Sequence, residues 1–306
     1  YQRCHVWPAV SDRSCSIIRA LGGVSDTGCS ACFTTNDPPF SGYVSGLLSA
    51  GRTVFTAEEA EQALGVGRGA FLDAAERLQR RKALLNPRQG FYVVVPPLFA
   101  SWGAPPPASY IDALMRHEGQ AYYVGLLKAA ELHGATHQAV MEFQVISAKR
   151  LPKIRAGRNL IVFYFRKDME AVKAGIEDRK TDTGTMKILS AALTALDLLR
   201  YPRASGGIDN VATVLPDLGQ KIDPEQLAAI SVTVERPIVQ RLGHLLDRLG
   251  HGALSRPMLK ALRARGSVPW AELDRQEARA VDFAAEPRKR DSRWRIIVRR
   301  APEPDE

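Results

Sequence analysis

A chain of 306 residues is long enough for two domains, since single domains usually run to about 100 to 200 residues. Its 45% hydrophobic and 25% charged residues are typical of a globular protein and give no sign of general disorder. The formal net charge of +9 favours an acidic partner, either nucleic acid or an acidic protein face, unless the basic surface is merely solvated. No run of about 18 apolar residues occurs, and the first residues hold no signal-peptide core, so we expect a cytoplasmic protein without membrane contact.

Residues 1–39 show neither helical nor strand periodicity. We expect a disordered leader here, or sequence upstream of the true start, and exclude it from the fold. All four cysteines lie in this segment, and Cys29 and Cys32 form a Cys-x-x-Cys. Cys4 and Cys15 are too far apart to supply the second close pair of a four-thiolate zinc site, so we expect no metal.

Residues 40–97 have the pattern of a winged helix-turn-helix. Apolar residues at helical spacing predict a first helix that stops at Ala50-Gly51, and a capping box at Thr56 and Glu59 begins a second helix. After the turn Gly65-Val66-Gly67, a third helix is predicted over 68–81, followed by a hairpin built from 83–85 and 91–95. In this arrangement the third helix is the one that enters the major groove.

The basic residues of this segment form one positive edge, whereas the acidic residues gather in the second helix. Lys and Arg along such an edge release counterions from phosphates, and Arg can read guanine. The alternative is a solvated helix face with i, i+4 ion pairs, Asp73 with Arg77 and Glu76 with Arg80. The predicted DNA-binding residues are Arg68, Arg77, Arg80, Arg81, Lys82 and, at the wing tip, Arg88.

The proline-rich residues 98–108 predict a stiff linker to a larger α+β domain over 109–300, with a tail at 301–306. The predicted helices of this domain cover 109–117, 123–132, 191–199, 208–218, 225–229, 238–249 and 258–264. The predicted strands cover 143–146, 160–165 and 294–298.

A second basic stretch runs from Phe143 to Lys167 and contains no Asp or Glu. It fits an acidic partner face or DNA that flanks the main site, and a solvated loop is the remaining interpretation. Its basic residues are Lys149, Arg150, Lys153, Arg155, Arg158, Arg166 and Lys167, of which the first five are the candidate partner or secondary DNA surface.

Signatures of catalysis are mostly absent: no phosphate-binding lysine loop, nucleophile elbow or His-Glu-x-x-His occurs. His133 and His137 are spaced like helical metal ligands, but Gly134 interrupts them and no third ligand is obvious. We therefore predict no catalytic residue, metal or cofactor. Asp197 and Asp209 are the carboxylates that a divergent nucleotide-transferring enzyme would use, and this is the least favoured hypothesis.

Three segments resemble the AbiE-type (AbiEi) antitoxins of type IV toxin-antitoxin systems, in the subgroup with a winged helix. They are residues 88–96, the long segment 122–138, and 195–199 leading into 206–212, and the resemblance covers the chain from about Ser45 to Val298. It implies a repressor that binds repeats upstream of its own operon and opposes a nucleotidyltransferase-like toxin. It also implies that 122–138 is core packing and a turn, and it carries over no catalytic residue. An orphan transcription regulator, whose larger domain senses a ligand or forms a dimer, is the alternative.

Overall fold

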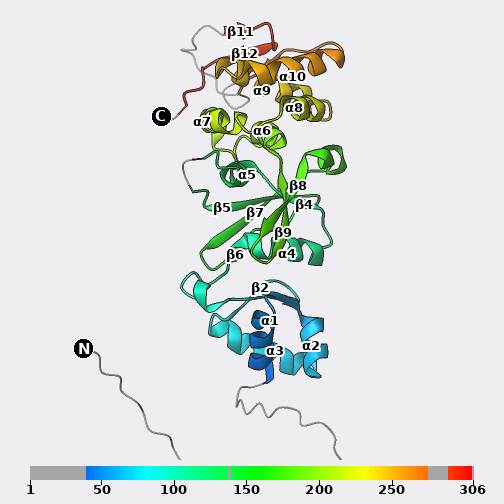
Figure 1. Cartoon of the computed structure of the whole chain (residues 1–306), viewed down its shortest axis with the longest axis vertical. Helices are drawn as coiled ribbons and strands as arrows, with labels where there is room; N and C mark the ends of the chain where they lie inside the picture. The colour runs from blue at the N-terminus through cyan, green and yellow to red at the C-terminus, as the bar shows by residue number, and fades with distance from the viewer. Residues whose placement is uncertain (1–38, 137–138, 275–288, 305–306) are drawn as a thin grey trace, which may run out of the picture. The chain divides into compact units, whose positions relative to one another are not determined.

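A computed structural model describes residues 39–136, 139–274 and 289–304 (Figure 1). The expectations for the leader, the four cysteines and His137 fall outside these residues. The described chain is α+β, with a small N-terminal helical unit and a larger C-terminal region, as the sequence predicts. None of its described helices is long and apolar enough to cross a membrane.

The N-terminal unit is a winged helix-turn-helix. Its elements are α1 (Pro39–Ser49), β1 (Val54–Thr56), α2 (Ala57–Leu64), α3 (Arg68–Arg80), β2 (Leu84–Arg88) and β3 (Phe91–Val94). The three strands form an antiparallel sheet in the order β1-β3-β2, in which the short β1 was not predicted from the sequence.

Local sequence signals explain the turn between α2 and α3. The Glu59 N–H donates to the Thr56 hydroxyl over 3.2 Å, and the Thr56 N–H donates to the Glu59 carboxylate over 3.1 Å, which completes the predicted capping box. Gly65 ends α2 with a φ of 61°, a left-handed conformation that costs glycine little. Aromatic rings fill the core, with Phe71 and Tyr92 edge to face at 5.3 Å.

The C-terminal region, from Pro107 onward, is built on a six-stranded mixed sheet in the order β6-β7-β5-β4-β9-β8. Its first elements are α4 (Ile111–His117), β4 (Tyr122–Val124), α5 (Leu126–Leu132), β5 (Glu142–Ser147), β6 (Ile154–Ala156), β7 (Asn159–Phe165), β8 (Ile176–Thr181) and β9 (Gly184–Leu189). The central strand β4 pairs antiparallel with β5 and parallel with β9.

The helix predicted from Tyr123 is wrong in its first residues, because Tyr122–Val124 form strand β4 and only Leu126–Leu132 are helical. All three strand residues are buried, and they are aromatic or β-branched, which favours a strand. Gly125 separates the two elements: a Cβ there would lie 2.4 Å from the Ile146 Cδ1 atom. The hairpin of β8 and β9 and the short β6 were also not predicted.

In the described part of the chain, five helices follow the sheet: α6 (Ala191–Arg200), α7 (Gly207–Gly219), α8 (Pro224–Ser231), α9 (Arg236–Arg248) and α10 (Gly252–Ala264). Every residue of α6 from Ala191 to Leu199 is buried. A last small sheet contains β10 (Ala271–Glu272), β11 (Lys289–Asp291) and β12 (Ile296–Val298), and Figure 1 shows β11 and β12 beside α9. Trp294, which we expected at the start of the terminal strand, lies instead in a turn and is fully buried.

Candidate nucleic-acid interface

The outer face of α3 is exposed and carries three of the predicted DNA-binding residues. Phe71, Ala75 and Leu78 face the core, whereas Arg68, Arg77 and Arg80 face solvent. Arg81 and Lys82 follow directly after the helix and are exposed as well. The structure therefore collects these five cations along α3 and its C-terminal end.

The cations of α3 differ in how they are neutralised. Arg80 pairs with Glu76 at 2.7 Å, and both side chains are more than half exposed, so the pair contributes little to stability. The anticipated pair of Asp73 with Arg77 does not form. Within the described residues, Arg77 has no ion-pair partner, and neither do the cations that follow α3. An incoming phosphate would therefore not have to displace a carboxylate from them.

Arg88 lies at the tip of the β2–β3 hairpin, as expected, but its side chain is only 18% exposed and contacts the C-terminal region. Its Nε lies 2.8 Å from the Glu118 carboxylate, and its Nη2 donates to the Pro152 carbonyl over 2.6 Å. The guanidinium also lies over the Phe163 ring, 5.7 Å from the centroid. The neighbouring Gln89 carbonyl is 3.0 Å from His117 Nε2, so the tip of the β2–β3 hairpin is held by the C-terminal region.

The five cations of the second basic stretch, Lys149, Arg150, Lys153, Arg155 and Arg158, are all exposed. They lie between β5 and β7, on a segment that contains β6. The Arg88 contact with Pro152 places this segment beside the wing. Arg166 belongs to the same basic stretch of the sequence, but only 4% of its area is exposed. It therefore does not contribute to this basic surface.

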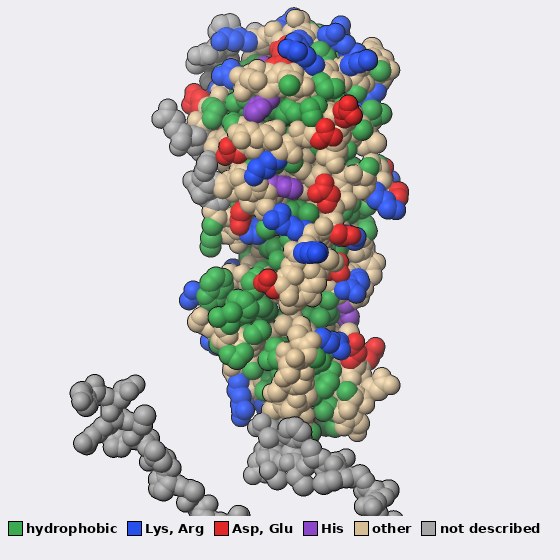
Figure 2. All heavy atoms as spheres, viewed as in Figure 1, with side chains coloured by type: hydrophobic (Ala, Val, Ile, Leu, Met, Phe, Trp, Pro, Cys, Tyr) green, Lys and Arg blue, Asp and Glu red, His purple; other side chains and the backbone are tan. Residues whose placement is uncertain are grey.

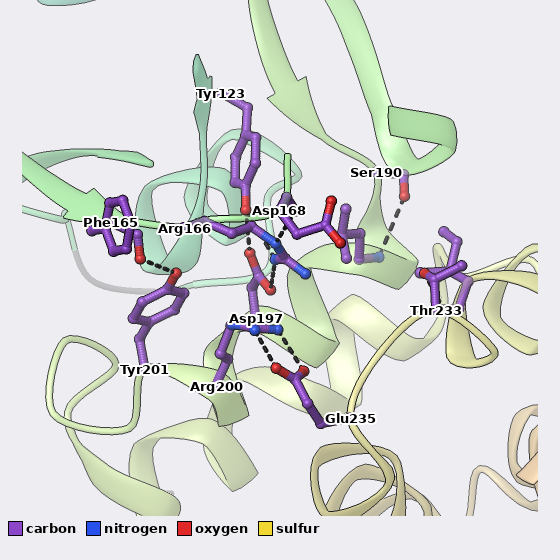
Figure 3. Close-up of polar contacts among 12 residues, drawn as sticks. Tyr123, Phe165, Arg166, Asp168, Ser190, Asp197, Arg200, Tyr201, Thr233 and Glu235 are labelled. Atoms are coloured by element: carbon purple, nitrogen blue, oxygen red, sulfur yellow. Dashed lines mark hydrogen bonds and ion pairs between the residues drawn. The ribbon is translucent and has the colours of Figure 1, made fainter. Parts of the chain in front are cut away.

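Arg166 belongs instead to a buried polar cluster with Asp197 and Tyr123 (Figure 3). Its Nη1 is 2.7 Å from one Asp197 oxygen, and the Tyr123 hydroxyl donates to the other over 2.8 Å. Burial raises the pKa of the Asp197 carboxyl, an effect that the Arg166 charge opposes. Burial also raises the pKa of Tyr123. The cluster joins β4, the end of β7 and α6, which is a structural role.

Asp209 has separate partners and is not paired with Asp197. The Arg300 Nη2 lies 2.5 Å from one of its oxygens, and the Glu303 N–H donates to the other over 2.9 Å. Because Arg300 hydrogen-bonds the carboxylate, the pKa of Asp209 is lowered. His133 contacts the Leu189 carbonyl through Nε2 at 2.7 Å, and the described residues contain no group of three His, Cys, Asp or Glu arranged to hold a metal.

Comparison with known proteins shows a similarity within the C-terminal region. Residues 123–248 match the family model described as the AbiEi antitoxin C-terminal domain. Over that segment the chain is similar to the AbiEi antitoxin C-terminal domain. The crystal structure of the RV2827C protein from Mycobacterium tuberculosis superposes with a TM-score of 0.60 at 19% identity, covering 85% of this chain and 91% of that one. This similarity concerns the fold alone, and a search of curated proteins gave no match.

The start of the C-terminal region also borders a cavity of about 540 Å³ that the sequence did not indicate. It lies between β1 of the winged helix, α4 and the β8–β9 hairpin, and its lining includes Arg52, Asp112 and Arg116. Arg52 is paired with Glu59, and Arg116 with Asp112 at 2.9 Å. These residues come from distant parts of the chain, so no local sequence motif could have predicted the cavity. Glu118 and His117, which hold the wing, were missed for the same reason.

Proposed function

We propose that this chain is the antitoxin and transcriptional autorepressor of a type IV toxin-antitoxin operon. It binds its own promoter through α3 and opposes a nucleotidyltransferase-like toxin in the cytoplasm, without catalysing a reaction itself. The observation that carries the proposal is a winged helix-turn-helix in the same chain as an AbiEi antitoxin C-terminal domain. The first part supplies a reader of duplex DNA, and the second links that reader to a toxin.

The electrostatics of α3 support DNA as the partner of the N-terminal unit. Arg77 is exposed and has no carboxylate partner in the described chain, so it can contact a base edge or a phosphate. Lys82, just beyond the helix, suits a phosphate contact. The wing contacts the C-terminal region, so its Arg88 is not available to DNA. The exposed cations of residues 149–158 are a second basic surface, which could contact flanking DNA or a protein.

A salt titration of DNA binding tests this proposal directly. Wild-type protein would be titrated against the duplex upstream of its own gene and against a scrambled duplex of the same length. We expect tighter binding to the promoter and a linear fall of log K with log salt. Equal, weak binding to both duplexes would contradict autorepression, and a toxin whose growth arrest the chain does not relieve would contradict the antitoxin role.

The cavity of about 540 Å³ favours a second candidate, a regulator that senses a small ligand. Its volume falls in the usual range of small-molecule sites, about 300–1,000 Å³. A ligand there would touch both the winged helix and the C-terminal region. Absence of a toxin gene beside this one, together with a metabolite that shifts operator affinity, would favour this alternative. A nucleotide-transferring enzyme has less support, because Asp197 is buried and bonded to Arg166.

A further inference from the structure

The last small sheet, formed by β10, β12 and β11, turns one of its faces away from the core. The strand register places Glu272, Ile297 and Arg290 in one row across the three strands. Ile296, in the next row, is fully buried, so its row faces the core and the row of Arg290 faces outward. Because side chains alternate along a strand, Arg295 belongs to the outward face too, and it is exposed.

An exposed tryptophan lies at the edge of this outward face. Trp270 immediately precedes β10 and is 42% exposed. The Arg290 guanidinium lies over its indole, 5.7 Å from the ring centroid. A guanidinium held over a ring keeps its N–H donors for another partner, because the ring takes up only the face of the cation. We call Trp270, Arg290 and Arg295 the stacking face.

The positive charge of the stacking face is not neutralised. Glu272 pairs with Arg299 at 2.8 Å, and Asp291 contacts His244 at 2.7 Å, so both carboxylates of the three strands are already engaged. Within the part of the chain that the structure describes, the two arginines of the stacking face have no carboxylate partner. Figure 2 shows Lys and Arg side chains gathered over the region where Figure 1 places α9, α10, β11 and β12.

An exposed ring beside free cations selects among the possible partners. Duplex DNA would engage the arginines through its phosphates, but its bases are paired and stacked, so the indole would have nothing to contact. A membrane surface requires several apolar side chains on the binding face, and the outward row of the described sheet offers only Ile297. A single strand presents phosphates and unstacked bases together, and bases stack on Trp rings and on Arg guanidinium planes.

We propose that the stacking face binds single-stranded RNA, in the form of a loop or a free end. RNA is favoured over a DNA strand because RNA loops and ends leave bases unpaired, whereas DNA is mostly duplex. The arginines contact phosphates, and a base stacks on Trp270 or Arg290 with little dependence on sequence. This activity goes beyond operator binding by α3 and does not depend on it.

The test measures the binding of a labelled oligouridine of about 12 nucleotides to variants of the full chain by fluorescence anisotropy. Trp270→Ala should weaken RNA binding about fivefold or more, because the ring stacks on a base. Trp270→Phe keeps a ring and should recover part of that loss. Trp102→Ala is the matched control, since Trp102 is 49% exposed and lies outside the stacking face. It should bind RNA as the wild type does.

The cations of the stacking face should act through the salt dependence. Arg290→Ala and Arg295→Ala should each lower the slope of log K against log salt by about 0.7, the value for one phosphate contact on a single strand. Arg203→Ala removes an exposed cation from the turn after α6 and should leave the slope unchanged. Arg77→Ala, on α3, should weaken binding to the operator duplex and leave RNA binding unchanged, which separates the two surfaces.

Several results would overturn the inference. They are failure of the wild-type chain to bind the oligouridine at low salt, and undiminished RNA binding by the Trp270→Ala/Arg290→Ala double variant. Loss of operator affinity in the variants of the stacking face would assign that face to duplex DNA. Tighter binding of oligothymidine or of anionic lipid vesicles than of the oligouridine would assign it to DNA strands or to a membrane. Urea unfolding of each variant checks that it is folded, so the test stands even where the operator is not bound.

Discussion

The guanidinium of Arg88 lies 2.8 Å from the carboxylate of Glu118, and this pair fastens the wing of the winged helix to the C-terminal region. Both side chains are less than one-fifth exposed. In many winged-helix proteins the wing is free to reach a DNA groove, whereas here its tip is already engaged. The winged helix and the C-terminal region should therefore respond to perturbation as a coupled pair.

Removing Arg88 should weaken that coupling. Arg88→Ala deletes an ion pair, a hydrogen bond to Pro152 and a ring contact, so we expect the free energy of unfolding to fall by about 1–3 kcal/mol. Urea unfolding measures the loss, and hydrogen exchange at Gln89 and Gly90 locates it. Arg80→Ala, which breaks only the exposed pair with Glu76, is the control and should cost less than about 1 kcal/mol. Equal losses would mean that the Arg88 contacts do not stabilise the wing.

The exposed cations of α3 and of the residues just after it should matter for DNA binding and not for stability. If Arg77 reads a base, Arg77→Ala should weaken operator binding by about 1–3 kcal/mol. The same loss is expected for Arg80→Ala if Arg80 exchanges its contact with Glu76 for one with a base. Lys82→Ala should lower the slope of log K against log salt by about one, because one phosphate contact is lost. Operator titrations at several salt concentrations measure both effects. Unchanged binding in all three variants would refute the assignment of α3 as the recognition helix.

The buried pair of Arg166 and Asp197 should be very sensitive to the loss of one partner. Arg166→Met leaves a buried carboxylate without its cation, so we expect destabilisation of about 3–5 kcal/mol. The double variant Arg166→Met/Asp197→Leu removes both charges and should recover part of that loss. Urea unfolding measures both. A double variant that is no more stable than Arg166→Met would mean that the unpaired charge is not the cause.

The contact of Asp209 with Arg300 should make stability depend on pH in acid. The folded chain lowers the Asp209 pKa below its ordinary value of 3.8, so the contribution is fully present above that value. It is lost as the pH falls through the lower, folded-state pKa. Wild-type stability should therefore decline more steeply below about pH 4 than that of Asp209→Asn. Parallel curves in urea unfolding from neutral to acid pH would contradict a stabilising contact.

Gly157 should tolerate no side chain. Its φ is +56°, which is strained for any residue with a side chain, and a Cβ at this position would lie 2.3 Å from the Trp102 carbonyl oxygen. Gly157→Ala therefore introduces both backbone strain and a steric clash. We expect a loss of about 1–3 kcal/mol in unfolding free energy and a change in Trp102 fluorescence. Gly51→Ala has a similar φ of +70° but open space around it, and should cost less. Similar costs at the two positions would show that the close approach is unimportant.

The three helices and the β2–β3 hairpin of the winged helix were predicted because their signals are local, whereas the short β1 was missed. The capping box at Thr56, the glycine turn at Gly65 and the aromatic periodicity each act within a few residues. Sequence periodicity did not identify the strand Tyr122–Val124. All three of its residues are buried, so its sequence lacks the alternation of apolar and polar residues that distinguishes a strand from a helix. Periodicity also failed for β8, whose Glu177, Asp178 and Lys180 are exposed and form no apolar pattern.

For the candidate interface, the sequence identified which residues are basic but not what they contact. Arg77 and Lys82 are exposed as expected, whereas Arg88 is bound to Glu118 and Arg166 is buried with Asp197. Both partners are thirty or more residues away in the chain, so spacing holds no information about them. A basic residue close to a carboxylate only in the folded state cannot be recognised from sequence alone.

The position of β4 at the centre of the six-stranded sheet affects how the protein folds during synthesis. The helices and strands of the winged helix all lie within residues 39–94, so it can fold early. Strand β4 needs β9 as its parallel neighbour, and Val124 pairs with Ile188 across a long stretch of chain. Closing such a loop is slow, and it cannot begin before β9 has left the ribosome. We therefore expect a nascent chain in which the winged helix is already folded while the six-stranded sheet still lacks its central pairing.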